Sequence, residues 1–85
     1  MPTPTDELLA ERGNTHGDFA EHAAVTYAIK DAISSLGNID ELSVMQREAL
    51  DMIAHKIGRI VAGNPNHADH WDDIAGYACL VSQRL

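Results

Sequence analysis

Residues 43–66 read SVMQREALDMIAHKIGRIVAGNPN and define one long amphipathic helix between two clear boundaries. Ser43 and Gln46 have the spacing of a capping box, in which each side chain satisfies a free backbone N–H of the first turn. The letters GNPN at 63–66 are typical of a helix end, because glycine adopts the left-handed conformation there and proline cannot continue the helix. The sequence therefore predicts a helix from about residue 43 to Ala62.

The side chains of this predicted helix separate into two faces at 100° per residue. The apolar face has Lys56 at its edge and consists of Ala49, Leu50, Ile53, Ile57, Ile60 and Val61. The opposite side carries Glu48, Asp51, His55 and Arg59. Asp51 and His55 have a spacing that suits a metal, but a solvated, salt-bridged face is the favoured interpretation because Glu48 and Arg59 share it.

Similar boundaries predict three further helices. Residues 6–12 form a short helix that ends at Gly13, and a longer one starts at Thr15, with Asp18 as a capping-box partner, and ends near Leu36. The last helix opens at Asp69 and runs towards Leu85. The expected fold is all-α, a small helical bundle of one short and three longer helices. Residues 1–85 form a single domain, with a short N-terminal helix and loop at 1–14 and a three-helix core at 15–85.

Composition excludes several classes of protein. The charge of −7, from 13 acidic against 6 basic residues, argues against nucleic-acid binding, which needs a basic surface. No apolar run is long enough to span a membrane, and residues 1–6 have no features of a secretory signal. A single cysteine, Cys79, leaves no disulfide framework, so a cytoplasmic protein is expected, in the host cell cytoplasm if the chain is phage-encoded. A chain of 85 residues has a thin core, so a homo-oligomer is expected.

Polar residues that continue the apolar helix faces predict a ligand pocket. These inward-leaning or flanking residues are Asp18, His22, Lys56, His70, Trp71, Asp73 and Tyr77. Most of them lie near the N-terminal half of a predicted helix. If the second and last helices bring those halves together, the set converges on one ligand-binding pocket.

Each candidate also has a structural explanation. Asp18 caps a helix through Thr15, and Asp69 and Asp72 fit the cap and third positions of the last helix, where the helix dipole stabilises acids. A histidine such as His22 is more often a hydrogen-bonded core residue than a ligand, and Trp71 suits a core or interface anchor.

Asp73 has the weakest structural explanation. A carboxylate among apolar neighbours needs a partner such as Lys56, a histidine or a metal. With Asp69 and Asp72, Asp73 is also the candidate set for a metal ion.

Three segments carry a resemblance to known proteins. They are THGDF at 15–19, EALDMIAHKI at 48–57 and DHWDDIAGY at 69–77. Together they resemble a family of small bacteriophage and prophage proteins, which implies a helical phage accessory protein. A more distant likeness is to the all-α nucleotide pyrophosphohydrolases of the MazG and dimeric dUTPase type, in which two acid pairs on neighbouring helices hold magnesium. Here Glu48 and Asp51 are similar to the first pair. For the second, His70 stands at the glutamate position before Asp73, and the shifted pair Asp69 and Asp72 does not restore the pattern.

Three functional hypotheses follow. The first is a phage-type accessory binding protein that holds a small ligand, such as a nucleotide, or a host protein, in a role that counters host defence. The second is a magnesium-dependent nucleotide pyrophosphohydrolase. The third is a structural or assembly protein without a small-molecule site. The sequence leaves open whether the chain is an enzyme, and a cofactor is implied only by the second hypothesis.

Overall fold

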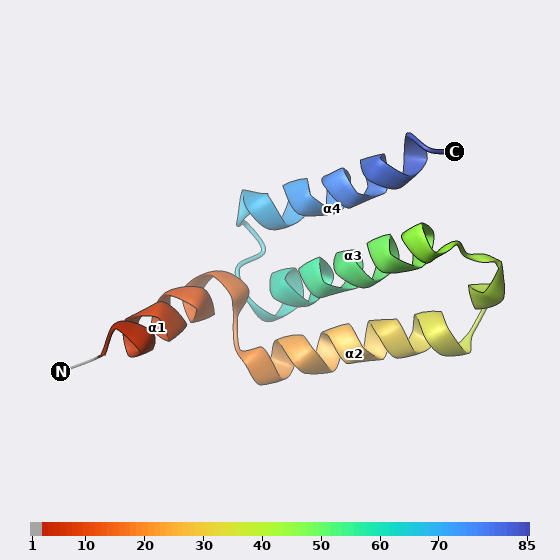
Figure 1. The fold of residues 1–85 in the computed structure, drawn as a ribbon. Helices are drawn as coiled ribbons and strands as arrows, with labels where there is room; N and C mark the ends of the chain where they lie inside the picture. Colours follow the sequence, from red (N-terminus) through yellow and green to blue (C-terminus); the bar gives the residue numbers. More distant parts are fainter. Residues whose placement is uncertain (1–2) are drawn as a thin grey trace.

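The computed structural model describes residues 3–85, with the side chains of residues 13–16 left out of the description. Four α-helices and one short 3-10 turn make up this part of the chain, and it contains no strand (Figure 1). The helices are α1 (Pro4–His16), α2 (Phe19–Ser35), α3 (Val44–Ala62) and α4 (Ala68–Ser82), and the turn η1 is Ile39–Glu41. The all-α prediction is therefore confirmed.

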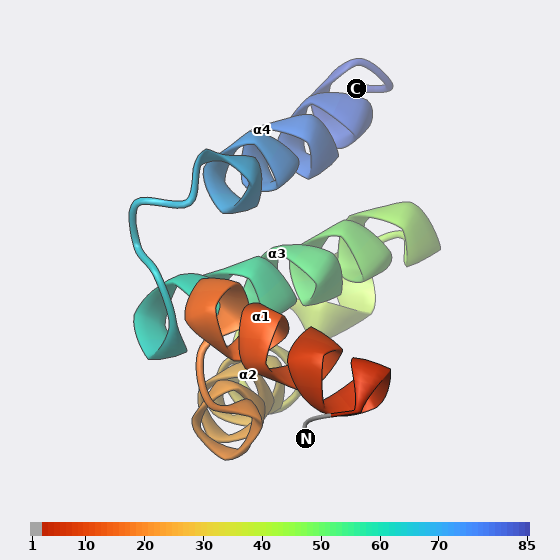
Figure 2. The ribbon, with the colours of Figure 1, turned by 90° about the vertical axis from the view of Figure 1, so that its left-hand side faces the viewer.

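Helix α3 lies between α2 and α4. The latter two pack on opposite sides of it, so that three helices lie side by side in one layer (Figures 1 and 2). Helix α1 leaves one end of this layer, where it contacts α2 and α3 (Figure 2). The N-terminal ends of α2 and α4 thus lie at the same end of the molecule as the C-terminal end of α3, but on different sides of α3.

The boundaries of α3 agree with the sequence. Ser43 is its N-cap and accepts from the backbone N–H of Gln46, whose side chain accepts in turn from the backbone N–H of Ser43. The helix ends at Ala62 with Gly63 as its C-cap, but Gly63 has a φ of −130° and does not adopt the left-handed conformation expected of it. Helix α2 likewise ends at Ser35, one residue before the expected end, and Gly37 turns the chain with a φ of +73°.

The junction of the first two helices differs from the prediction. The first helix passes through Gly13 and ends only at His16, where Gly17 adopts a φ of +81° and breaks it. Helix α2 therefore begins at Phe19, with Asp18 as its N-cap, and the Asp18 carboxylate accepts from the backbone N–H of Glu21 at 3.2 Å. The capping role expected of the Thr15 side chain lies outside the described residues.

The start of α4 also differs. Its N-cap is His67, whose side chain makes no capping bond, and Asp69 lies in the first turn rather than at the cap. The loop before α4 contains an internal hydrogen bond, in which the Asn64 side chain accepts from the backbone N–H of Asn66. The placement of Asp69 and Asp72 at the cap and third positions of the last helix is therefore wrong.

The interior is thin. Among the described residues, the only apolar side chains in the buried class are Ala49 and Ala54, and no large side chain is completely enclosed. Among the same described residues, Thr26, Lys56 and His70 are the buried polar ones; Lys56 is on α3 and Thr26 packs against Gly58 of α3. A single layer of helices has this property because each helix can bury only the sides that face its neighbours.

Candidate functional site

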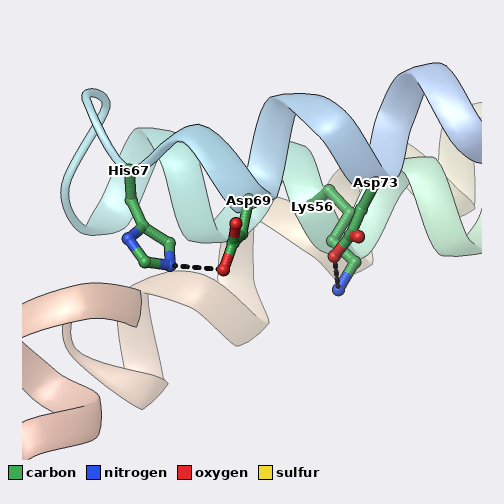
Figure 3. A network of polar contacts seen from close by, with 4 residues as sticks. All are labelled: Lys56, His67, Asp69 and Asp73. Atoms are coloured by element: carbon green, nitrogen blue, oxygen red, sulfur yellow. Dashed lines mark ion pairs between the residues drawn. The ribbon is translucent and has the colours of Figure 1, made fainter.

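The acidic residue with the weakest structural explanation has the expected partner. Asp73 of α4 forms an ion pair with Lys56 of α3, with 3.0 Å between the carboxylate oxygen and Nζ (Figure 3). Lys56 is buried, whereas the Asp73 side chain is about half exposed. The hydrogen bond from Lys56 holds the pKa of Asp73 below its usual value, because it stabilises the charged carboxylate. This ion pair links α4 to α3.

Two other expected ligand residues of α4 also have structural contacts. His70 is 2% exposed and its ring lies 4.7 Å from that of His67, in an edge-to-face arrangement. The indole Nε1 of Trp71 donates to the backbone carbonyl of Pro65 at 2.8 Å, which closes the loop between α3 and α4. Tyr77 lies further along α4, where it lines a shallow surface pocket with Asp72, Asp73 and Leu80.

The three acids at the start of α4 do not assemble into a metal site. Asp73 turns towards Lys56, while the exposed Asp69 carboxylate lies 3.7 Å from Nε2 of His67 (Figure 3). Within the described part of the chain, no group of three or more His, Cys, Asp or Glu side chains is placed to hold a metal ion. The expected metal set Asp69, Asp72 and Asp73 is therefore not brought together, since Asp73 pairs with Lys56 and Asp69 lies beside His67.

The predicted pocket divides into two separate places. Asp18 and His22 lie on the α2 side of α3, while Lys56, His70, Trp71, Asp73 and Tyr77 belong to the α3–α4 side. Helix α3 stands between α2 and α4, so the expected convergence of their first turns does not occur. The prediction assumed that these two helices are neighbours, which the sequence could not establish.

A better-formed cavity lies where α1, α2 and α3 meet. It has a volume of about 430 Å³ and is lined by Leu9, Arg12, Gly17, Asp18, Phe19, His22 and Arg59. Two arginines face it, Arg12 from α1 and Arg59 from α3, and neither forms an ion pair with a described residue. Of the expected ligand residues, this corner pocket contains Asp18 and His22.

A second cavity of about 430 Å³ continues along the groove between α2 and α3. We call it the α2–α3 groove, and its lining residues are Phe19, His22, Ala23, Thr26, Tyr27, Lys30, Asp31, Ser34 and His55. Phe19 and His22 line both cavities, so the two are contiguous. Phe19 and Tyr27 are 78% and 73% exposed, which leaves two aromatic rings free at the edge of the groove.

His22 stands at the junction of the two cavities. Its ring centroid lies 6.2 Å from that of Phe19 and 5.9 Å from that of His55. Its Nε2 atom and the Oγ1 atom of Thr26 are both buried without a hydrogen-bond partner. Buried polar atoms are normally paired, so these two atoms are an unusual polar feature of the contact between α2 and α3 beside the groove.

Glycine allows the close approach that builds this groove. A methyl group on Gly58 of α3 would overlap the Thr26 hydroxyl and the His22 ring, and would lie 3.1 Å from the His22 backbone carbonyl. Similarly, a methyl group on Gly17 would overlap the backbone carbonyl of Ala62 at the end of α3. These two glycines hold α2 and the α1–α2 junction against α3 and thereby position His22 beside Arg59.

A family model described as a domain of unknown function, DUF6378, matches residues 4–85, which is nearly the whole chain. The chain belongs to this family. Neither a curated protein nor a solved structure matches it. In this DUF6378 chain, no described helix combines the length and apolar character needed to cross a membrane.

The arginines of the corner pocket in this DUF6378 chain were not among the residues expected to bind a ligand. Arg12 is the last residue of the short helix predicted over residues 6–12, and the sequence favours a salt-bridged face for Arg59. Within the described residues, however, Arg59 forms no ion pair with Glu48 or Asp51. The signal that could have found Arg59 is its position on α3, one turn beyond His55 and opposite the apolar face.

Burial and nearby cations lower the pKa values of both histidines in the groove. For His22 the larger cause is burial, with the charges of Arg59 and His55 acting in the same direction and the His55 backbone opposing them. For His55 burial is again the larger cause, and Lys30, Arg59 and Lys56 act with it against Asp51. Both rings are therefore held in the neutral form below the pH at which a free histidine becomes protonated.

The depressed histidine pKa values predict a pH dependence of stability. Since the unfolded chain binds protons at the ordinary histidine pKa of about 6.5 and the folded chain only at lower pH, their contribution to stability is complete above that value. It is lost as the pH falls from about 6.5 through the lower folded pKa values. We expect the melting temperature to decline over this range, and less steeply in His22→Asn. The control His67→Asn removes a histidine on the other side of α3. A decline of equal slope in His22→Asn would contradict the assignment.

Proposed function

We propose that this chain is a helical binding module that holds a small phosphate-bearing ligand, in the simplest case a nucleotide, in the corner pocket and the adjoining α2–α3 groove. The observation that carries the proposal is the pair of arginines, Arg12 and Arg59, that face one cavity without a carboxylate partner among the described residues. In a chain with only 6 basic residues against 13 acidic ones, two arginines at one site with no ion-pair partner in the described part of the chain favour an anionic ligand.

The surroundings of the arginines support a phosphate group in particular. The corner pocket lies at the N-terminus of α2, where backbone N–H groups and the helix dipole favour negative charge. Asp18 already occupies part of that terminus, since its carboxylate accepts from the Glu21 backbone N–H. A phosphate with several acceptor oxygens can engage both guanidinium groups at once.

The adjoining groove supports a planar aromatic portion of the ligand. Phe19 and Tyr27 present exposed rings at its edge, and the polar side chains of Thr26, Ser34 and His55 also line it. Aromatic walls with a few polar atoms are the usual surroundings of a nucleobase or similar ring. The two contiguous cavities have volumes in the range of sites for small ligands.

A binding role is favoured over metal-assisted hydrolysis by the placement of the acids. Glu48 and Asp51 lie on α3, and the described acids around them do not gather into a group of three that could hold a metal. The acids of α4 are on the far side of α3 and make other contacts. The binding-module hypothesis therefore agrees better with the arrangement of charges than the pyrophosphohydrolase hypothesis does.

Calorimetric titration with ATP and with inorganic triphosphate tests the proposal. We expect Arg59→Gln to raise the dissociation constant about 10- to 100-fold, which corresponds to the loss of one charge-assisted hydrogen bond. Arg84→Gln is the matched control: it removes the same charge from the exposed end of the chain, where Arg84 donates to the Leu80 carbonyl.

The comparison of the two variants decides the outcome. The absence of binding in the wild-type protein would contradict the proposal. So would an equal weakening in both variants, because the affinity would then reflect net charge and not this pocket. Release of inorganic phosphate or pyrophosphate from ATP with magnesium would favour the pyrophosphohydrolase hypothesis instead.

A further inference from the structure

A second copy of this chain, we infer, packs against the uncharged face of the helix layer and forms a symmetric dimer. This inference concerns the side of α3 opposite the proposed ligand pocket and does not rest on the proposed function. It follows from the shape of the layer, the amount of surface it exposes, and the distribution of apolar and charged side chains between its two faces.

The chain exposes more surface than a monomer of its size. Its accessible surface is 5970 Å², whereas a monomeric protein of 9.2 kDa exposes about 4,900 Å². Its radius of gyration is 15.0 Å, against about 12 Å for a compact domain of this length. The difference in area is about 1,000 Å² for each chain. Two chains that buried this excess would share about 2,000 Å² in total, which is enough for a stable homodimer.

The two faces of the layer differ in chemistry. On α3, Arg59 is nine residues from Leu50, which places them on opposite sides of the helix. The side with Arg59 and His55 borders the ligand cavities. The side with Leu50 also presents Ile53, Ile57 and Val61, and no charged residue shares their phase. We call this second side the uncharged face.

The uncharged face extends over α4. A groove of about 360 Å³ runs along the contact of α3 with α4 and is lined by Leu42, Gln46, Ala49, Leu50, Ile53, Ala78, Val81, Ser82 and Leu85. No charged side chain lines it. Trp71, which is 54% exposed, shares the phase of Ala78 on α4 and continues the face towards the loop. On α3, Val61 is 64% exposed although it lies among apolar neighbours.

Charge explains why this face suits a second copy. The chain carries a net charge of −7, so two copies repel each other unless they meet where charges are few. The uncharged face meets this condition. In a two-fold dimer the same surface of both copies meets, so this apolar face would contact its own copy. A single layer of helices then becomes two packed layers, which gives residues such as Ile53 and Ile57 the enclosed core that one chain lacks.

Sedimentation equilibrium tests the dimer with a matched pair of substitutions on α3. We expect the wild-type chain to have twice the chain mass, and Val61→Glu to raise the dissociation constant about 100-fold or more, because two buried carboxylates would face an apolar surface. The control is Val44→Glu, since Val44 is 88% exposed and borders a pocket with Glu48 and Arg84 on the other side of α3. It should leave the dimer intact.

Acrylamide quenching of Trp71 gives a test that needs no variant. The wild-type indole should become less accessible to the quencher as the protein concentration is raised through the dissociation constant. A wild-type chain that remains a monomer at every concentration overturns the inference. Equal dissociation of the Val61→Glu and Val44→Glu variants also overturns it, as does quenching that is the same in monomer and dimer.

Discussion

Gly17→Ala should lower the free energy of unfolding by about 2–5 kcal/mol. Gly17 has a φ of +81°, a conformation that costs an L-residue about 1–2 kcal/mol. In addition, its new methyl group would overlap the backbone carbonyl of Ala62, which is not a flexible side chain that can move aside. Overpacking of this kind typically costs a further 1–3 kcal/mol. Urea denaturation monitored by circular dichroism measures the loss.

Gly37→Ala is the matched control, because it measures the cost of a positive φ without the steric overlap. Gly37 also has a positive φ, +73°, but an added methyl group there has no neighbour within 4 Å. We therefore expect Gly37→Ala to cost only about 1–2 kcal/mol. Equal losses in the two variants would mean that the junction of α1 and α2 does not press against the end of α3. The placement of Asp18 and Phe19 in the corner pocket would then be wrong.

Gly58→Ala should also destabilise the protein, by up to about 2 kcal/mol, although alanine is the better helix former. The added methyl group would meet Thr26 and the ring and backbone carbonyl of His22, so α2 and α3 must separate slightly. The overpacking cost of about 1–3 kcal/mol exceeds the gain of about 0.8–1.0 kcal/mol from helix propensity over most of this range. Because the ring of His22 must move, ligand affinity should fall together with stability.

The control for Gly58 is Gly76→Ala on α4. Gly76 also lies inside a helix, but nothing is within 4 Å of its added methyl group. This variant should gain about 0.5–1 kcal/mol, since alanine loses less backbone freedom than glycine on folding. If Gly58→Ala is stabilised to the same extent, the two helices do not approach as closely as described, and the α2–α3 groove is wider than its lining residues indicate.

The sequence alone predicted the features of the fold that depend on interactions between neighbouring residues. The capping box of Ser43 and Gln46, and the end of α3 at Ala62, follow from interactions between residues a few positions apart. The prediction of a helix end at Gly13 was wrong, because Gly13 lies within α1. A glycine can be accommodated inside a helix at modest cost. The residue type alone therefore does not show whether the helix ends at Gly13 or at Gly17. Only the contact of Gly17 with the end of α3 makes the difference.

The candidate site was predicted in part. Helical phase placed His22 on an inward-facing side, and Lys56 was one of the three partners expected for Asp73, with a histidine and a metal. Phase gives the direction of a side chain from its own helix, but it does not say which helix is the neighbour. The position of α3 between α2 and α4 therefore could not be predicted, and neither could the meeting of Arg12 with Arg59.

The proposed ligand pocket depends on the same contacts as the fold. Gly17 and Gly58 allow α2 to lie close to α3, and that approach brings His22 and Phe19 to the side of α3 that carries Arg59. The opposite side remains apolar and free of charge. One helix thus separates a surface suited to an anionic ligand from a surface suited to a second chain.

The most direct measurement is a titration of isotope-labelled protein with ATP, followed residue by residue by nuclear magnetic resonance. We predict that the largest shifts occur at Phe19, His22 and Arg59, with those of Trp71 and Asp73 close to zero. Shifts that are largest at the start of α4, or an unchanged spectrum at saturating ATP, would contradict the proposal that the corner pocket binds a phosphate-bearing ligand.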